Sequence, residues 1–270
     1  MKKNIEQEKA IAQLEGPVIL ISCPGSGKTT TLLRRINHML EVGIPPEKIL
    51  MITFTKAAAQ EMSVKFKKKF GEPNGITFST IHALCLKILM TYGGLSAENI
   101  IKTSDQWKFL LETARKCQSV CDPAKAAGNF QMLYSAAMNN RMSPSEVNPK
   151  DIKGISRKDF LFMSEEYRRM KERTGYIDFD DMLVKAYELM TGNPQVLRQL
   201  RERWDYIQVD EYQDVNYLQR DLVYLLAGEK KNLCVAGDDD QSIYRFRGAR
   251  PEIMLNFPKD FPQAHVFCIS

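Results

Sequence analysis

The chain has 270 residues, of which 44% are hydrophobic and 26% charged, and a formal net charge of +5 at pH 7. This length suits one large domain or two of ordinary size, and the composition is typical of a globular protein. No apolar run approaches the ~20 residues of a membrane span, and the N-terminus lacks the apolar core of a signal peptide. We therefore exclude the membrane and secreted classes and expect a cytoplasmic protein, whose mild positive charge permits an anionic partner.

The six cysteines are scattered along the chain. Only Cys117 and Cys121 lie close together, and no histidine or second cysteine pair accompanies them. We expect buried or incidental thiols rather than a zinc site or disulfides.

The first part of the chain alternates strands with helices. Apolar runs predict buried strands at residues 17–21, 49–54 and 76–80. Helical spacing follows each run, in segments that begin at residue 30, span 56–70 and span 81–92. Strands joined in this way by helices predict an α/β fold, with a parallel sheet that has helices on both faces.

The first predicted strand leads into the glycine-containing loop Ser22–Thr29, and a helix follows the loop. Gly25 and Gly27 allow the backbone to curl so that its N–H groups face phosphate oxygens, and the helix N-terminus adds its positive dipole end. Lys28 would reach the β- and γ-phosphates of a nucleotide, and the Thr29 hydroxyl would hold Mg²⁺. A simple glycine turn is the alternative, but the flanking strand and helix favour a phosphate-binding P-loop.

Strand signals disappear between about residue 95 and residue 175. Helical periodicity replaces them, at 105–120, 123–140 and 157–174. We predict an all-helical subdomain at 95–175, inserted into an α/β domain that comprises residues 1–94 and 176–270.

The α/β pattern resumes after the insertion. Helical spacing predicts helices at 180–190, 194–204 and 216–227. Apolar runs predict strands at 206–210, 232–237 and 265–269. Because the last predicted strand reaches the end of the chain, we expect the sequence to be part of a longer protein.

Two acidic residues end one of these later strands. Asp210 and Glu211 would lie at the carboxyl edge of a parallel α/β sheet, which is where ligands bind in such folds. We expect Asp210 to hold Mg²⁺ through its water shell and Glu211 to orient and deprotonate the attacking water. An ordinary acidic turn is the alternative, and the P-loop upstream favours the functional interpretation.

The loop after the next strand carries further polar and aromatic residues. Gln241 could sense the γ-phosphate or position water at the same sheet edge. Tyr244, Phe246 and Arg247 mix aromatic with cationic groups, a combination that stacks on bases and meets phosphates. Core aromatics with surface arginines are the alternative for this last group.

Several segments resemble motifs of the UvrD/Rep/PcrA helicases of superfamily 1A. Asp210-Glu211-Tyr212-Gln213-Asp214 and residues 237–249 are similar to motifs II and III of that family. Four further segments agree in order: 4–7 resembles the Q motif, 53–62 motif Ia, 80–85 motif Ib, and 178–182 the acidic motif after the inserted domain. Six ordered motifs over nearly the whole chain make this resemblance specific.

The resemblance implies the N-terminal half of an ATP-dependent DNA helicase. Its α/β part would be the RecA-like P-loop motor subdomain 1A, and the helical insertion would be subdomain 1B. Such enzymes move 3′ to 5′ along single-stranded DNA and unwind duplexes, in repair or replication. The expected partners are single-stranded and partly duplex DNA and a second motor domain of the same protein, with no membrane; the expected cofactors are ATP and Mg²⁺.

The same resemblance assigns roles to individual residues. The catalytic residues would be Lys28, Asp210, Glu211 and Gln241. The nucleotide would contact Gln7, Ser22, Cys23, Pro24, Gly25, Ser26, Gly27, Lys28, Thr29 and Thr30, with Gln7 reading the adenine edge. Mg²⁺ would be held by Thr29 and Asp210. DNA would contact Phe54, Thr55, His82, Tyr244, Phe246 and Arg247.

The chain also departs from the family pattern. Ser22 stands for the usual first glycine of the P-loop, Thr30 for an arginine beside the nucleotide, and Phe246 for a tryptophan. Motif Ia often has Asn-Lys where this chain has Lys56-Ala57. The next family motif, Asn-Tyr-Arg-Ser, and the second motor domain with its arginine fingers would lie beyond the sequence. Two alternatives stay open: the motor half of a helicase–nuclease, and a nucleotide- or DNA-binding module without turnover.

Overall fold

The computed structural model describes residues 5–23, 25–72, 74–150, 152, 154–238 and 250–269. Its strands are β1 (Val18–Ser22), β2 (Ile49–Thr53), β3 (Thr77–Thr80), β4 (Tyr206–Val209), β5 (Leu233–Gly237) and β6 (His265–Ile269). All are parallel and form one sheet in the order β3-β2-β4-β5-β1-β6. In the register, Val18 of β1 lies between Cys234 of β5 and His265 of β6. The carboxyl ends of the strands therefore share one edge.

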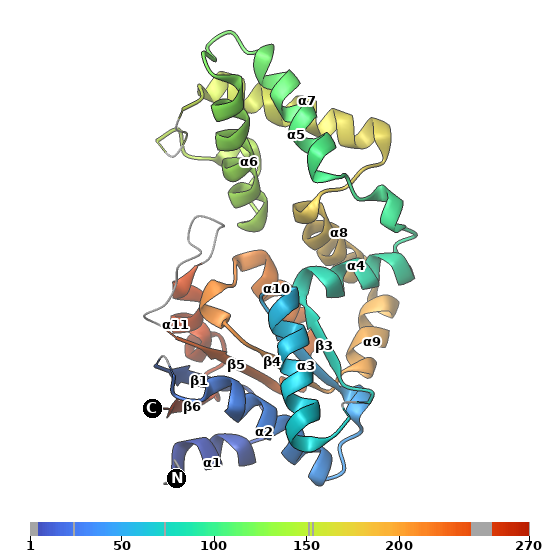
Figure 1. The fold of residues 1–270 in the computed structure, drawn as a ribbon, viewed down its shortest axis with the longest axis vertical. Helices are drawn as coiled ribbons and strands as arrows, with labels where there is room; N and C mark the ends of the chain where they lie inside the picture. Colours follow the sequence, from blue (N-terminus) through green and yellow to red (C-terminus); the bar gives the residue numbers. More distant parts are fainter. Residues whose placement is uncertain are drawn as a thin grey trace.

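Both faces of the sheet are buried. Val18 and Leu20 of β1 pack in one hydrophobic core, whereas Ile19 packs in another, because successive side chains of a strand point to opposite faces. One face is covered by α1 (Ile5–Ala12), α2 (Lys28–Glu41) and α3 (Lys56–Phe70) (Figure 1). The other is covered by α4 (Ile81–Tyr92), α8 (Phe179–Gly192), α9 (Pro194–Arg203), α10 (Tyr217–Ala227) and α11 (Pro251–Asp260). The predicted α/β fold with a parallel sheet is confirmed.

Three more helices gather at one end of the molecule, away from the sheet: α5 (Thr103–Arg115), α6 (Pro123–Asn139) and α7 (Arg157–Thr174) (Figure 1). They enclose a third hydrophobic core, in which Phe130 contacts Phe160 and Tyr167. The division of the chain at residues 95 and 175 stays a prediction, which this separate core favours.

A buried charge network joins α7 to α8. Lys171 Nζ lies 3.1 Å from Asp178 Oδ2 and 2.8 Å from Asp181 Oδ2. The Tyr167 hydroxyl donates to Asp178 Oδ2 at 2.8 Å, and the other oxygen of Asp178 caps α8 by accepting from the Asp181 amide. This network fixes the point at which the helical part of the chain returns to the sheet.

Some elements differ from the sequence-based expectation. α5 ends at Arg115 rather than at residue 120, since Ser119 leaves the helix and donates to the Asp159 carboxylate at the start of α7. The helices α1 and α11 were not predicted as helices. The described residues also contain short 3₁₀ helices: η1 (Pro46–Lys48), η2 (Ala97–Asn99), η3 (Pro144–Glu146) and η4 (Tyr212–Asp214).

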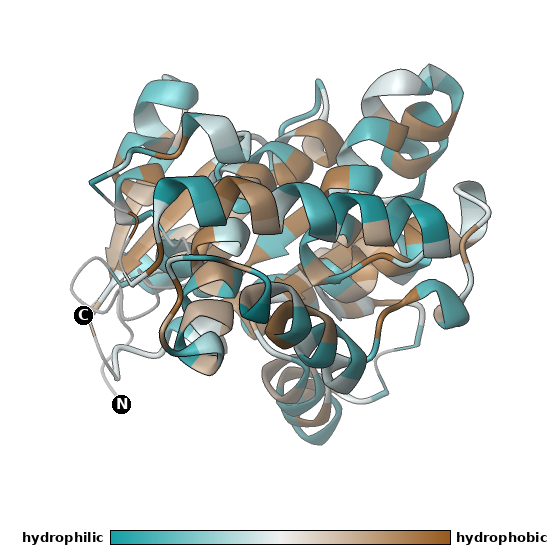
Figure 2. Ribbon diagram, turned by 90° about the horizontal axis from the view of Figure 1, so that it is seen from above, coloured by the Kyte–Doolittle hydropathy of each residue, from teal (hydrophilic) through white to brown (hydrophobic). Residues whose placement is uncertain are grey.

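Hydrophilic and hydrophobic residues alternate along the helices, as expected of helices with one face packed and one face exposed (Figure 2). None of the described helices has both the length and the apolar character needed to cross a membrane.

Candidate functional site

The loops after β1 and β4 carry the predicted nucleotide site. Both strands are neighbours of β5, so their carboxyl ends lie close together on one sheet edge. The helix α2 begins at Lys28, directly after the glycine loop. Gly25 and Gly27 have left-handed φ angles of 79° and 87°. A Cβ atom on Gly27 would also stand only 3.2 Å from the side-chain nitrogen of Gln7, so this position requires glycine.

Lys28 meets both acidic residues that follow β4. Its Nζ lies 2.5 Å from Glu211 Oε2 and 3.5 Å from Asp210 Oδ1. Gln213 donates from Nε2 to the same Glu211 oxygen at 2.7 Å, and its Oε1 accepts from the Asp238 amide at 3.0 Å. The Lys28 amine and the Gln213 amide therefore connect the loops that follow β1, β4 and β5.

The two carboxyl groups have different surroundings. Burial raises the pKa of Asp210 to about 6, although the Lys28 ammonium lowers it and the Glu211 carboxylate raises it again. Glu211 is half-buried and has a φ of 53°, which is uncommon for a residue other than glycine. A buried carboxyl beside a second carboxylate gains strongly from a nearby divalent cation, so the pair suits Mg²⁺.

The glycine loop is held from two sides. Gln7 donates from Nε2 to the Ser26 carbonyl at 2.7 Å, and Ser22 Oγ donates to the Gly237 carbonyl at 3.0 Å. Ser22 has no left-handed φ, so the structure needs no glycine there. Ser26 Oγ is buried and has no hydrogen-bond partner within the described residues. A buried hydroxyl in this state is satisfied by a phosphate oxygen, so the loop fits a nucleotide.

Thr29 and Thr30 lie in the first turn of α2. They line a cavity of about 390 Å³ together with Leu33 and three lysines of α3, Lys65, Lys68 and Lys69. Among the described residues, no hydrogen bond joins Thr29 to Asp210, and Thr29 as a magnesium ligand stays a prediction. Cys23, also predicted to contact the nucleotide, is exposed.

A second cavity, of about 630 Å³, lies between the same sheet edge and α6. Its wall contains three predicted DNA contacts, Phe54, Thr55 and His82. The exposed Phe179 also lines it, with its ring edge-to-face to His82 at 6.1 Å between centroids. Burial lowers the pKa of His82 to about 4, so this imidazole is neutral at pH 7. These uncharged rings offer surfaces on which a base can stack.

Carboxylates supply the charge of this cavity. Asp180, Asp210 and Asp214 belong to its wall, whereas no lysine or arginine among the described residues does. An anionic phosphate would be repelled by these groups, while a neutral base would not. The cavity therefore suits a nucleobase better than a phosphate.

Five of the predicted site residues lie outside the described residues: Pro24, Gln241, Tyr244, Phe246 and Arg247. The structure adds residues to which the sequence assigned no role: Met132, Asn139, Phe179, Asp180 and Gln213. Phe179, Asp180 and Gln213 lie inside the motifs at 178–182 and 210–214, and that position could have indicated that they belong to the site. Met132 and Asn139 come from α6, where no motif marks them.

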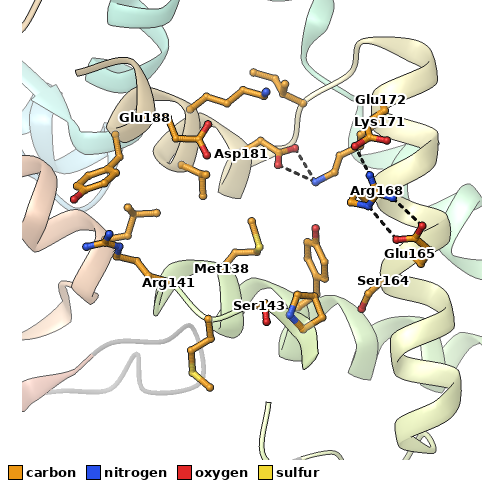
Figure 3. Close-up of a pocket in the computed structure, with 18 of the residues that line it drawn as sticks. Met138, Arg141, Ser143, Ser164, Glu165, Arg168, Lys171, Glu172, Asp181 and Glu188 are labelled. Carbon is orange, nitrogen blue, oxygen red and sulfur yellow. Dashed lines mark hydrogen bonds and ion pairs between the residues drawn. The ribbon is translucent and has the colours of Figure 1, made fainter. Parts of the chain in front are cut away.

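A larger cavity, of about 960 Å³, lies between α6, α7 and α8 and contains none of the predicted site residues (Figure 3). Some of its charged side chains pair with one another, whereas Lys185 and Glu188 form no ion pair within the described residues. Arg168 meets Glu165 and Glu172, and Lys171 meets Asp181 (Figure 3).

The parallel sheet, the glycine loop and the acidic pair at one edge define the class of RecA-like P-loop domains. A family model described as the UvrD/REP helicase N-terminal domain matches residues 3–262. The protein YjcD of Bacillus subtilis strain 168 is 36% identical over 276 residues, an alignment that covers 99% of this chain and 36% of YjcD. The ATP-dependent DNA helicase PcrA of Staphylococcus aureus strain Mu50 is 35% identical over 273 residues, covering 99% of this chain and 37% of PcrA.

The chain belongs to the UvrD/REP helicase N-terminal domain family. It spans little more than a third of the length of these relatives.

Proposed function

We propose that this chain is the N-terminal ATP-binding part of an ATP-dependent DNA helicase. The whole protein would move 3′ to 5′ on single-stranded DNA and couple ATP hydrolysis to unwinding. The observation that supports this most strongly is the contact of Lys28 with Asp210 and Glu211. This contact joins the P-loop, which follows β1, to the acidic pair that follows β4, and β5 lies between these two strands.

Each group at this edge has a distinct proposed task. The backbone N–H groups of the loop, the Ser26 hydroxyl and the Lys28 amine would bind phosphates. Thr29 and Asp210 would hold Mg²⁺, which supplies positive charge to the phosphates when bound. Glu211 would take a proton from the attacking water, and the Gln213 amide, 2.7 Å from Glu211 Oε2, would keep that carboxylate in place.

The remaining assignments are proposed on the family resemblance, together with placement for those residues that the structure describes. Gln7 would read the adenine edge, and Ser22, Cys23, Pro24, Gly25, Gly27 and Thr30 would complete the nucleotide contacts. Gln241 would sense the γ-phosphate. Single-stranded DNA would pass over the same edge with bases in the cavity of about 630 Å³ and phosphates outside it, since the cavity is lined by rings and carboxylates. Tyr244, Phe246 and Arg247 would extend this path.

A single-strand titration tests the DNA part of the proposal. Stacking of one base on an aromatic side chain is worth about 1–3 kcal/mol, so Phe54→Ala should weaken binding of a fluorescent oligo(dT) by about one to two powers of ten. Phe162→Ala is a matched control, because Phe162 is 39% exposed on α7 and lines no part of this cavity. Equal losses in the two variants would exclude the cavity as the binding site.

The proposal extends to the rest of the protein. The partners would be single-stranded and partly duplex DNA and a second motor domain of the same protein. Residues 1–94 and 176–270 would form motor subdomain 1A, and residues 95–175 subdomain 1B. A role in DNA repair and a cytoplasmic location are parts of the same proposal.

A further inference from the structure

The wall that α6 and α8 contribute to the cavity beside Phe54 offers hydrogen-bond acceptors. Asp180 Oδ1 accepts from Ser135 Oγ at 2.9 Å and from Asn139 Nδ2 at 2.8 Å. Its second oxygen, Oδ2, accepts no hydrogen bond from any described residue. Since Asp180 is half-buried and lines the cavity, this oxygen is available to a ligand there.

Asn139 holds the Asp180 carboxylate in place from the same wall. Its side chain is 6% exposed, and its Nδ2 donates to the Ser135 hydroxyl oxygen at 3.1 Å as well as to Asp180. The opposite amide orientation would turn an oxygen toward the Asp180 carboxylate, so the hydrogen bonds fix this one. Asn139 Oδ1 is buried and has no partner among the described residues. Because that oxygen is buried away from the cavity, the acceptor that this wall offers to a ligand is Asp180 Oδ2.

We propose that Asp180 reads the exocyclic amino group of a nucleobase, so that the cavity prefers bases that carry this group. The inference rests on the proposed function, because it needs a single strand whose bases enter the cavity. An exocyclic amino group, such as that of cytosine or adenine, supplies N–H donors, one of which can meet the free oxygen of the Asp180 carboxylate. A base without it would leave this acceptor desolvated and unpaired.

Two strands that differ only in the amino group provide the test. The probes are a short oligo(dC) and the same oligomer built from 2-pyrimidinone, which is cytosine without its amino group. Burial raises the pKa of Asp180 to about 6, so titrations at pH 8 keep this carboxylate ionised. A hydrogen bond to a charged acceptor discriminates by about a power of ten, and we expect the 270-residue chain to bind oligo(dC) roughly tenfold more tightly.

Variants identify the group responsible. Asp180→Asn can still accept from Ser135 and Asn139 but turns an N–H donor to the cavity, so it should lose the preference and keep its general affinity. Asp180→Ala removes the acceptor altogether and should lose the preference as well. Ser135→Ala is the matched control, because it removes one hydrogen bond to Asp180 and leaves the carboxylate; the preference should persist.

The outcomes separate this inference from the proposed function. Equal affinity for the two strands, with Phe54→Ala still weakening both, would overturn the inference and leave the proposed function intact. A preference that survives in both Asp180 variants would overturn it too, because stacking would then explain the difference. Binding that Phe54→Ala does not change would overturn the proposed function and this inference together.

Discussion

The Asp210 carboxyl is 6% exposed and lies beside Glu211, so its negative charge is unfavourable in the folded chain. Lys28 offsets only part of this effect, since the pKa of Asp210 is about 6 rather than its ordinary 3.8. A residue that we propose binds a divalent cation is thereby held in surroundings that reduce stability. Functional sites commonly have such an arrangement, in which a residue needed for activity lowers the stability of the fold.

The linkage of this pKa to stability gives the first prediction. Between pH 3.8 and about 6 the folded state keeps the Asp210 proton while the unfolded state loses it, so the free energy of unfolding falls as pH rises through this window. Asp210→Asn removes the charge and should raise the free energy of unfolding at pH 8 by up to about 3 kcal/mol. Urea unfolding should show this gain disappearing by pH 4.

Asp105→Asn is the control for that measurement, because Asp105 is exposed in the first turn of α5. Its effect should be within about 0.5 kcal/mol at either pH. A gain for Asp210→Asn that is equally large at pH 4 and pH 8 would contradict the assigned cause.

Individual site residues were predictable where a local pattern specifies them. The glycine loop, the flanking strand and the acidic strand end predicted that Lys28 and the pair after β4 lie at one sheet edge, but not that they contact each other. The bond from Ser22 to the Gly237 carbonyl could not be foreseen, because it joins residues far apart in the sequence. The same is true of the Gln213 amide, whose two contacts depend on how β5 and η4 meet.

At the scale of elements, the junction of α7 and α8 depends on one buried ammonium group. Lys171 is 8% exposed and pairs with Asp178 and Asp181, both of which are also buried. Removing one member of a buried ionic group leaves uncompensated charge, which costs about 3–5 kcal/mol. We therefore expect Lys171→Met to lower the free energy of unfolding by about that amount, as measured by urea titration.

Lys185→Met provides the comparison for this variant, since Lys185 is exposed on α8 and takes part in no ion pair among the described residues. It should change stability by no more than about 0.5 kcal/mol. If the two methionine variants unfolded at the same urea concentration, the buried network would not be what holds α7 against α8.

The elements themselves could be predicted to different degrees. α7 has the predicted bounds because its amphipathic pattern is long and Gly175 ends it with a left-handed φ of 72°. α5 is shorter than predicted because Ser119 forms a tertiary hydrogen bond to Asp159. α1 is only eight residues long, so its pattern was too brief to indicate a helix.

At the scale of the whole molecule, the two candidate sites share one sheet edge and one residue. Asp210 belongs both to the acidic pair beside Lys28 and to the wall of the cavity that holds Phe54 and His82. The part that α6 plays in closing this cavity could not be predicted from the sequence, because α6 lies far from the motifs along the chain. The alternation of elements predicted only that the strands are parallel. It did not predict their order in the sheet, and that order brings the two sites together.

Slow turnover is the expectation for the chain as a whole. Lys28 and Mg²⁺ would supply positive charge from one side of the γ-phosphate, and two nearby arginines are already engaged: Arg34 with Glu8, and Arg35 with the Gln13 carbonyl. An arginine finger is worth about 10³–10⁵ in rate, and the family resemblance places such fingers in a second motor domain. We expect very slow ATP hydrolysis, little stimulation by single-stranded DNA and no unwinding.

Phosphate-release assays with and without single-stranded DNA measure that turnover. A DNA-stimulated rate of many turnovers per second would contradict the expectation and would mean that a finger lies within this sequence. Arg247→Ala and Arg250→Ala would then identify it.

The most direct test of the central claim is a titration of Mg²⁺ and a fluorescent ATP analogue into the chain and its Lys28→Ala variant. Lys28 forms ion pairs with both Asp210 and Glu211, and it would also bind the phosphates. We predict saturable binding by the unmodified chain and by Lys259→Ala, an exposed control on α11, and no measurable binding by Lys28→Ala. Equal affinity of Lys28→Ala and the unmodified chain would show that the nucleotide does not bind at this sheet edge.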